Sequence, residues 1–120
     1  MLKTLKLLSK SRIVSSYEVQ DFRQGNGFYF LKVRAILHNN TLLYIRQYVS
    51  DEEYSYSYHW QNENGLLIIR WDNAPHHKQI QTYPHHKHLG EEILASDEIT
   101  LEHVLEYIET FLEKRSHQLL

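Results

Sequence analysis

The fold is decided by residues 54–72, which read YSYSYHWQNENGLLIIRWD. Two runs rich in aromatic and β-branched residues, 54–61 and 66–71, stand on either side of the pair Asn64-Gly65. Runs of this composition are typical of strands. An Asn-Gly pair between them predicts a two-residue type I′ turn, because both central residues of that turn need positive φ. The segment therefore predicts a β-hairpin.

This turn also predicts which side chains share a face of the hairpin. A two-residue loop pairs Glu63 with Leu66, and counting back places Arg70 opposite His59. The apolar face, predicted to join the core, carries Tyr56, Tyr58, Trp60, Ile69 and Trp71. The opposite face carries Ser57, His59, Gln61, Ile68, Arg70 and Asp72. A four-residue loop would keep both faces and change only the pairing, because side chains alternate along a strand.

Similar strand-like runs extend upstream to Ile13, separated by turn signals at 25–27, 39–40 and 51–53. Residues 13–72 thus predict an antiparallel meander of about five strands. Downstream, Thr100 is a suitable N-cap for a helix over 100–116 with one apolar side. Residues 1–12 form either a short helix or an arm. The expected fold is a single α+β domain over 1–120, with the meander packed against the C-terminal helix.

Composition excludes several classes of protein. The 120 residues include no cysteine, which excludes disulfide scaffolds, thiolate nucleophiles and zinc sites built from sulfur. No apolar run reaches the roughly 20 residues of a membrane span, and Lys3 and Lys6 interrupt the N-terminal leucines where a signal peptide would have its core. A cytoplasmic protein without membrane contact is expected.

Glutamates follow one side of the predicted C-terminal helix, at 102, 106, 109 and 113. Like charges at this spacing weaken a helix slightly. They form either a solvated surface or an acidic ridge that answers a basic surface of the same fold or of a partner.

Five of the nine histidines lie between His76 and His88, in a segment (73–99) that shows no periodicity. One interpretation is a transition-metal site, zinc for example, because imidazole and carboxylate are suitable ligands. Its candidate ligands are Asp72, His76, His77, His85, His86 and His88. The interpretation we favour needs no cofactor: a cationic loop that binds phosphate and exchanges protons. Plain surface histidines are the third alternative.

His59 and Arg70 suggest acid–base chemistry on a phosphate. The planar guanidinium of Arg70 suits phosphate. Its positive charge disfavours the protonated form of His59, so His59 is better suited to act as a base than as an acid. The alternative is that both are ordinary polar side chains on a solvated sheet surface.

Four blocks stand out: 56–61 (YSYHWQ), 70–77 (RWDNAPHH), 83–88 (YPHHKH) and 100–105 (TLEHVL). Together they resemble the signature blocks of the TumE family, and the resemblance covers about residues 28–113. Tyr83 is a mild departure, because the family's last histidine block usually opens with Phe-Pro. The N-terminal arm lies outside the resemblance. The resemblance to the TumE family implies the toxin half of a toxin–antitoxin pair, and hence a cognate antitoxin.

By analogy with small toxins that cleave RNA without a metal, the leading hypothesis is a metal-independent endoribonuclease that binds RNA. His59 would be the base, Arg70 and Lys87 would contact phosphate, and one loop histidine would be the acid. Its candidate site residues are His59, Arg70, Asp72, His76, His77, His85, His86, Lys87 and His88. Two alternatives stay open: a metal-dependent nuclease or hydrolase centred on Asp72 and the loop histidines, and a non-catalytic interaction module. The sequence leaves open whether the protein forms a homodimer.

Overall fold

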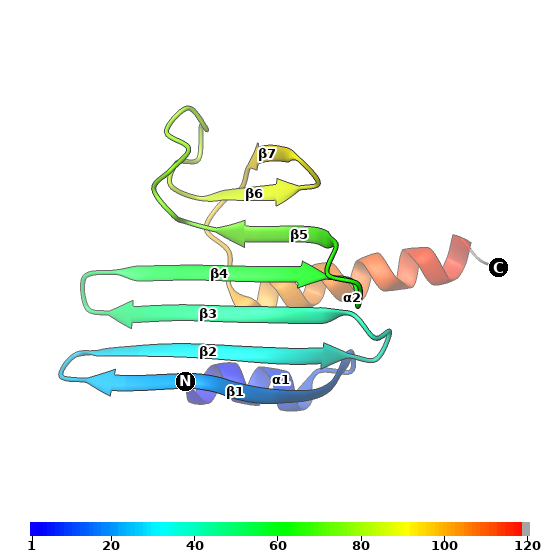
Figure 1. The fold of residues 1–120 in the computed structure, drawn as a ribbon, viewed down its shortest axis with the longest axis horizontal. Coiled ribbons are helices and arrows are strands. Elements are labelled where there is room, and N and C mark those ends of the chain that lie inside the picture. The colour runs from blue at the N-terminus through cyan, green and yellow to red at the C-terminus, as the bar shows by residue number, and fades with distance from the viewer. Residues whose placement is uncertain (119–120) are drawn as a thin grey trace.

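One antiparallel sheet of seven strands forms the body of the protein, and its strands lie side by side in chain order (Figure 1). The computed structural model describes residues 1–118. One helix precedes the sheet and one follows it, so the fold is α+β, as predicted. The elements are α1 (Leu2–Lys10), β1 (Val14–Gly25), β2 (Phe28–Leu37), β3 (Leu42–Ser50), β4 (Tyr54–Gln61), β5 (Leu67–Asp72), β6 (His86–Leu89), β7 (Glu92–Ala95) and α2 (Leu101–Gln118).

Both helices pack on the same face of the sheet (Figure 1). Leu8 of α1 and Val104 and Ile108 of α2 are buried in one cluster with apolar side chains from β2 to β5. Side chains alternate between the two faces of a strand, so the residues between these core positions lie on the other face. That second face, which neither α1 nor α2 covers, is called the open face below.

The predicted faces of the β4–β5 hairpin are confirmed except at Ile68, and so is the predicted pairing of His59 with Arg70. His59 pairs with Arg70 across the two strands. The five residues predicted for the apolar face are all buried: Tyr56, Tyr58, Trp60, Ile69 and Trp71.

The predicted type I′ turn is wrong. The Asn62 N–H donates to the Leu66 carbonyl at 2.9 Å, which leaves a three-residue loop in which Gly65 (φ 86°) has positive φ and Asn64 does not. A bulge in β5 then restores the predicted register, because the ladder skips Ile68. Two residues of a bulged strand oppose one of its partner, and Ile68 packs against the core instead of lying on the opposite face as predicted.

The sheet has two more strands than the sequence predicts. Strands β6 and β7 lie within 73–99, where the sequence shows no periodicity. They have four residues each, and β6 (HKHL) lacks the aromatic and β-branched residues that mark the earlier strands. Pairing with β5 therefore builds this part of the sheet, because strand preference depends more on neighbours than on the residue alone.

The N-terminal residues form a helix rather than an arm, and α2 begins where the Thr100 cap predicts. The His103 N–H donates to Thr100 Oγ1 at 3.4 Å. Arg12 forms an ion pair with Glu109 of α2 and lies 3.9 Å from Glu113. A basic residue of the same chain therefore neutralises part of the acidic side of α2. Neither helix within residues 1–118 combines the length and apolar character that membrane crossing requires.

Candidate functional site

The open face carries polar side chains in cross-strand rows. One row crosses from β2 to β6 through Lys32, Arg46, Ser57, Asp72 and His86. The next row runs through Arg34, Tyr44, His59, Arg70 and His88. Directly opposed side chains are neighbours on a sheet, so residues from five strands form one continuous polar surface.

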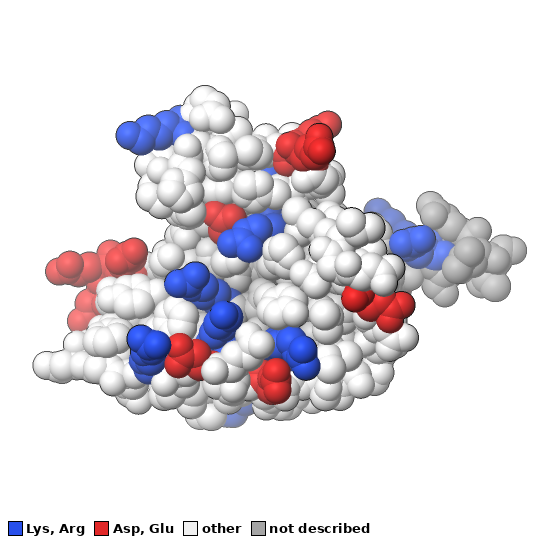
Figure 2. All heavy atoms as spheres, viewed as in Figure 1, with Lys and Arg blue, Asp and Glu red and all other residues white. Residues whose placement is uncertain are grey.

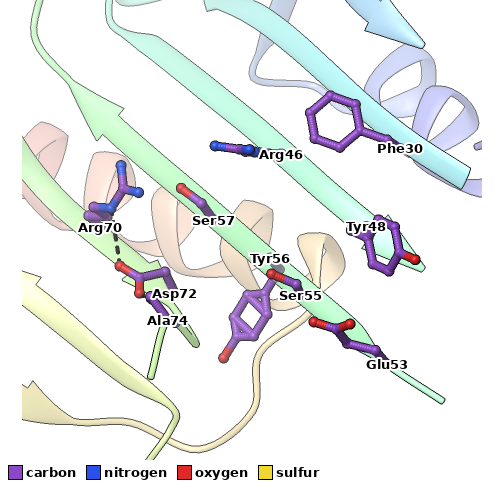
Figure 3. Close-up of a pocket in the computed structure, with 10 residues that line it drawn as sticks. All are labelled: Phe30, Arg46, Tyr48, Glu53, Ser55, Tyr56, Ser57, Arg70, Asp72 and Ala74. Carbon is purple, nitrogen blue, oxygen red and sulfur yellow. Dashed lines mark hydrogen bonds and ion pairs between the residues drawn. The ribbon is translucent and has the colours of Figure 1, made fainter. Parts of the chain in front are cut away.

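Small side chains in the middle of this face create a groove. Ser55 and Ser57 of β4 lie between longer side chains of β3 and β5 (Figure 3). Here a hollow of about 430 Å³ has Arg46 on one side and Arg70 on the other. A second hollow of about 310 Å³ shares Ser57, Arg46 and Arg70 and extends to His59. The two hollows make up a groove that two guanidinium groups flank.

Positive side chains outnumber negative ones along the groove, although the chain has a formal charge of −2. Lys32, Arg46 and Arg70 line it together with Glu53 and Asp72. Lysine and arginine side chains gather over the middle of the open face (Figure 2). Arg34 is paired with Glu18 at 3.4 Å, whereas within residues 1–118 neither Lys32 nor Arg46 has a carboxylate partner. The Arg46 guanidinium lies 5.2 Å from the centre of the Phe30 ring. The charges of Lys32 and Arg46 are therefore available to an anionic ligand.

His59 is held as a neutral imidazole. Arg70 Nη1 donates to His59 Nδ1 at 3.3 Å, and because a guanidinium only donates, this nitrogen carries no proton. The other nitrogen, Nε2, donates to Gln61 Oε1 at 3.0 Å. Burial and then the charge of Arg70 lower the pKa of His59 below its usual value. The lowering by Arg70 agrees with the sequence prediction, and a neutral ring can act as a base.

Asp72 joins this surface to the histidine-rich segment. Its Oδ2 accepts from Arg70 Nε at 3.1 Å (Figure 3) and lies 3.4 Å from His88 Nε2. Its Oδ1 accepts from the Ala74 N–H at 3.0 Å and lies 3.0 Å from His86 Nε2. Two strands and the chain after β5 thus converge on a single buried carboxylate.

Three histidines gather beside Asp72. The ring centres of His77 and His86 are 4.8 Å apart, those of His86 and His88 are 4.9 Å apart, and those of His77 and His88 are 5.7 Å apart. Each ring has a nitrogen within 4.8 Å of a nitrogen of the other two, so the group could hold a metal ion. We call Asp72, His77, His86 and His88 the Asp72 cluster. Burial lowers the pKa of His88, and His86, His77 and Arg70 add to this effect while Asp72 opposes it.

Three other candidates lie outside this cluster. His76 is exposed to solvent. His85 stacks on Tyr56, whose hydroxyl lies 2.8 Å from His85 Nδ1; burial raises the pKa of this tyrosine to about 12, so the hydroxyl stays protonated and donates. Lys87 pairs with Trp71, so it lies on the helix-covered face, away from Arg70.

Sequence reasoning missed the β2 and β3 part of the groove. Lys32 and Arg46 pair directly across these strands, and Tyr44 lies beside them on the open face. The signal was present: Lys32 and Arg34 alternate with apolar residues in 28–37, and Arg46 follows the apolar Ile45 in 42–50. The turn at 39–40 sets which of them face each other.

The family model described as Toxin TumE matches residues 4–116. The match includes most of α1, which the sequence resemblance over about 28–113 leaves out. No curated protein and no solved structure matches the chain. A toxin of this kind implies a cognate antitoxin as partner. With nearly its whole length matched, the chain belongs to the TumE family, the toxin component of a toxin–antitoxin system.

Proposed function

We propose that this toxin cleaves RNA, and that the groove of the open face holds the scissile phosphate. The observation that carries the proposal is the position of a neutral His59 against Arg70, in a basic groove that Arg46 completes. A guanidinium binds phosphate through two parallel N–H groups. Two arginines flanking a serine floor therefore suit a phosphodiester better than an uncharged substrate.

The chemistry follows from the acceptor nitrogen of His59. When Arg70 turns to a phosphate, His59 Nδ1 is released and takes the proton of the ribose 2′-hydroxyl. The 2′-oxygen attacks phosphorus, the bond to the 5′-oxygen breaks, and that oxygen leaves with a proton. The products are a 2′,3′-cyclic phosphate and a 5′-hydroxyl. Arg46 and Arg70 stabilise the negative charge that develops on the phosphate oxygens.

The proton for the leaving oxygen is assigned to the Asp72 cluster, which lies on the other side of Arg70 from His59. His88 pairs with Arg70, as His59 does from the opposite strand. Strands in a sheet are about 4.8 Å apart, so His59 and His88 lie about 10 Å apart with the guanidinium between them. As long as no metal ion occupies the Asp72 cluster, a phosphate bound to Arg70 would have a proton acceptor on one side and imidazoles that can carry a proton on the other.

A second candidate is metal-dependent cleavage of a phosphodiester. The convergence of three imidazoles and a carboxylate beside Arg70 favours it. A bound metal ion would polarise a phosphate oxygen or activate a water molecule. The two candidates differ in their products, because an activated water would leave no 2′,3′-cyclic phosphate.

The test uses the full chain, produced together with its antitoxin and then separated from it, with 5′-labelled RNA and single-turnover kinetics. His59→Gln should lower the cleavage rate by at least about 100-fold, the usual contribution of a general base. His38→Gln is the matched control, because His38 is exposed and lies outside the groove. The expected fragments carry cyclic phosphate ends. RNA left intact by the wild-type protein, or equal rates for His59→Gln and His38→Gln, would contradict the proposal.

A further inference from the structure

The buried ring of His86 faces an oxygen acceptor at each of its two nitrogens. This side chain is 2% exposed, and both of its ring nitrogens face oxygen atoms. Nδ1 lies 2.9 Å from the Pro84 carbonyl, which can only accept, and Nε2 lies 3.0 Å from Asp72 Oδ1. A neutral imidazole donates from one nitrogen only. With Nδ1 protonated, the Nε2 lone pair would face the carboxylate, so a positive charge is needed between His86 and Asp72.

A proton on His86 would supply that charge, but it would not account for the other two rings. His88 Nε2 also faces Asp72, at 3.4 Å from Oδ2, and His77 completes the group. Arg70 already donates to the same carboxylate. Additional protons on His77 and His88 would place like charges next to one another. One divalent cation at the centre would satisfy all three rings and the carboxylate together.

We propose that the Asp72 cluster is a binding site for one divalent transition-metal ion, with imidazole nitrogens of His77, His86 and His88 and the carboxylate of Asp72 as ligands. Four ligands of this kind suit tetrahedral zinc, which binds histidine nitrogen at about 2.0–2.1 Å. Ligand atoms in such a site lie about 3.4 Å apart. The nitrogens of the three histidines lie within 4.8 Å of one another, so ring rotations that shorten these distances by about 1.4 Å or less would bring them to one ion. Asp72 lies 3.0 Å from His86 Nε2 and 3.4 Å from His88 Nε2.

The surroundings of the site match those of known metal centres. A histidine ligand usually donates its other ring N–H to a backbone carbonyl or carboxylate, which fixes the nitrogen that faces the metal. The contact from His86 Nδ1 to the Pro84 carbonyl does this. The donor set also selects the class of ion: imidazole suits zinc, copper, nickel and iron, whereas magnesium and calcium prefer oxygen ligands.

Metal binding can be measured without any RNA, so its outcome is independent of the proposed nuclease activity. The protein is prepared without a polyhistidine tag or nickel resin, treated with a chelator and dialysed. Zinc affinity is then measured by competition with a chromophoric chelator, and cobalt(II) serves as a spectroscopic probe of the ligand geometry. The variants are His77→Gln and His88→Gln, both at partly exposed positions. The matched control is His76→Gln, next to His77 but exposed to solvent.

We expect one zinc ion per chain, visible absorption of tetrahedral cobalt(II), and an affinity at least about tenfold lower in each of the two variants, while His76→Gln binds as the wild type does. Circular dichroism verifies that the variants are folded. Binding of less than one ion per chain would overturn the proposal. So would equal affinities in all three variants, which would indicate adventitious binding by exposed histidines.

Discussion

Arg70 links the groove to the Asp72 cluster at the scale of single residues. Its Nη1 donates to His59, its Nε donates to Asp72, and its side chain lines both hollows of the groove. A lysine has one compact charge and no planar fork, so it could not make these contacts together. The guanidinium thus holds the base neutral and the carboxylate in place before any phosphate arrives.

The first prediction concerns the proton affinity of His59. Its pKa should lie below the usual 6.5, because burial and then Arg70 disfavour the imidazolium. Titration of the ring protons by NMR measures it directly. Arg70→Gln should raise the midpoint only part of the way to 6.5, because burial, the larger cause, remains. Gln61 acts in the opposite direction by accepting from Nε2, so Gln61→Leu should lower the midpoint further.

The sign of the linked stability change follows from this shift. The unfolded chain binds a proton at His59 more readily than the folded chain does, since the pKa is lower in the folded state. The contribution of neutral His59 is therefore fully present above about pH 6.5 and is lost as the pH falls through and below that value. Urea unfolding at pH 7.5 and 5.5 should show a larger loss in the wild type than in His59→Gln. An equal loss in both would contradict the assignment.

At the scale of elements, a polar network inside the core joins α1, β3 and β4. Thr4 Oγ1 donates to Gln47 Oε1 at 2.8 Å, and Gln47 Nε2 donates to Tyr58 Oη at 2.9 Å. Tyr58 Oη also lies 2.8 Å from Tyr54 Oη. Every member has a partner, so the network fixes how α1 sits on the sheet without leaving a buried polar group unsatisfied.

The second prediction tests this network through Tyr58, which is fully buried. Tyr58→Phe keeps the ring but leaves Gln47 Nε2 without an acceptor, so it should lower the free energy of unfolding by about 1–3 kcal/mol. Tyr58→Ala removes the ring as well and should cost about 3–5 kcal/mol. Chemical denaturation measures both. Tyr44→Phe, at a half-buried position on the open face, is the control and should change stability by less than about 0.5 kcal/mol. Equal costs for the two phenylalanine variants would contradict this role.

The elements also explain how far the sequence could predict the site. The His59–Arg70 pair was predictable, because both lie in one hairpin; the error in the turn was cancelled by the bulge at Ile68. The sequence predicts a group made of Asp72 and loop histidines, but not which of the histidines belong to it. Which histidines reach Asp72 depends on β6 pairing with β5, and this places His86 and His88 on the open face and Lys87 on the other. A segment without periodicity gives no signal for that register.

At the scale of the whole molecule, positive charge is concentrated locally around the groove of the open face. The open face carries Lys32, Arg46 and Arg70 around the groove. The helix-covered side carries charges of both signs, the glutamates of α2 and the lysines of α1. A net charge of −2 therefore conceals a basic surface. These three cations attract a polyanion to the groove locally, although the chain as a whole is slightly acidic.

The third prediction is that RNA binding depends on salt through these three cations. For single strands the logarithm of affinity falls with the logarithm of salt with a slope of about −0.7 per neutralised phosphate, so three contacts predict a slope of about −2. Arg46→Gln should weaken binding and reduce the slope to about −1.4.

Lys6→Gln is the control, because Lys6 is exposed on α1, on the helix-covered side, and should leave the slope unchanged. Fluorescence anisotropy at pH 8, where histidines are mainly neutral, isolates lysine and arginine. A fully 2′-O-methylated oligonucleotide prevents cleavage, because it has no 2′-hydroxyl to attack phosphorus. If Arg46→Gln and Lys6→Gln change the slope equally, RNA does not follow the open face, and the groove loses its role in substrate binding.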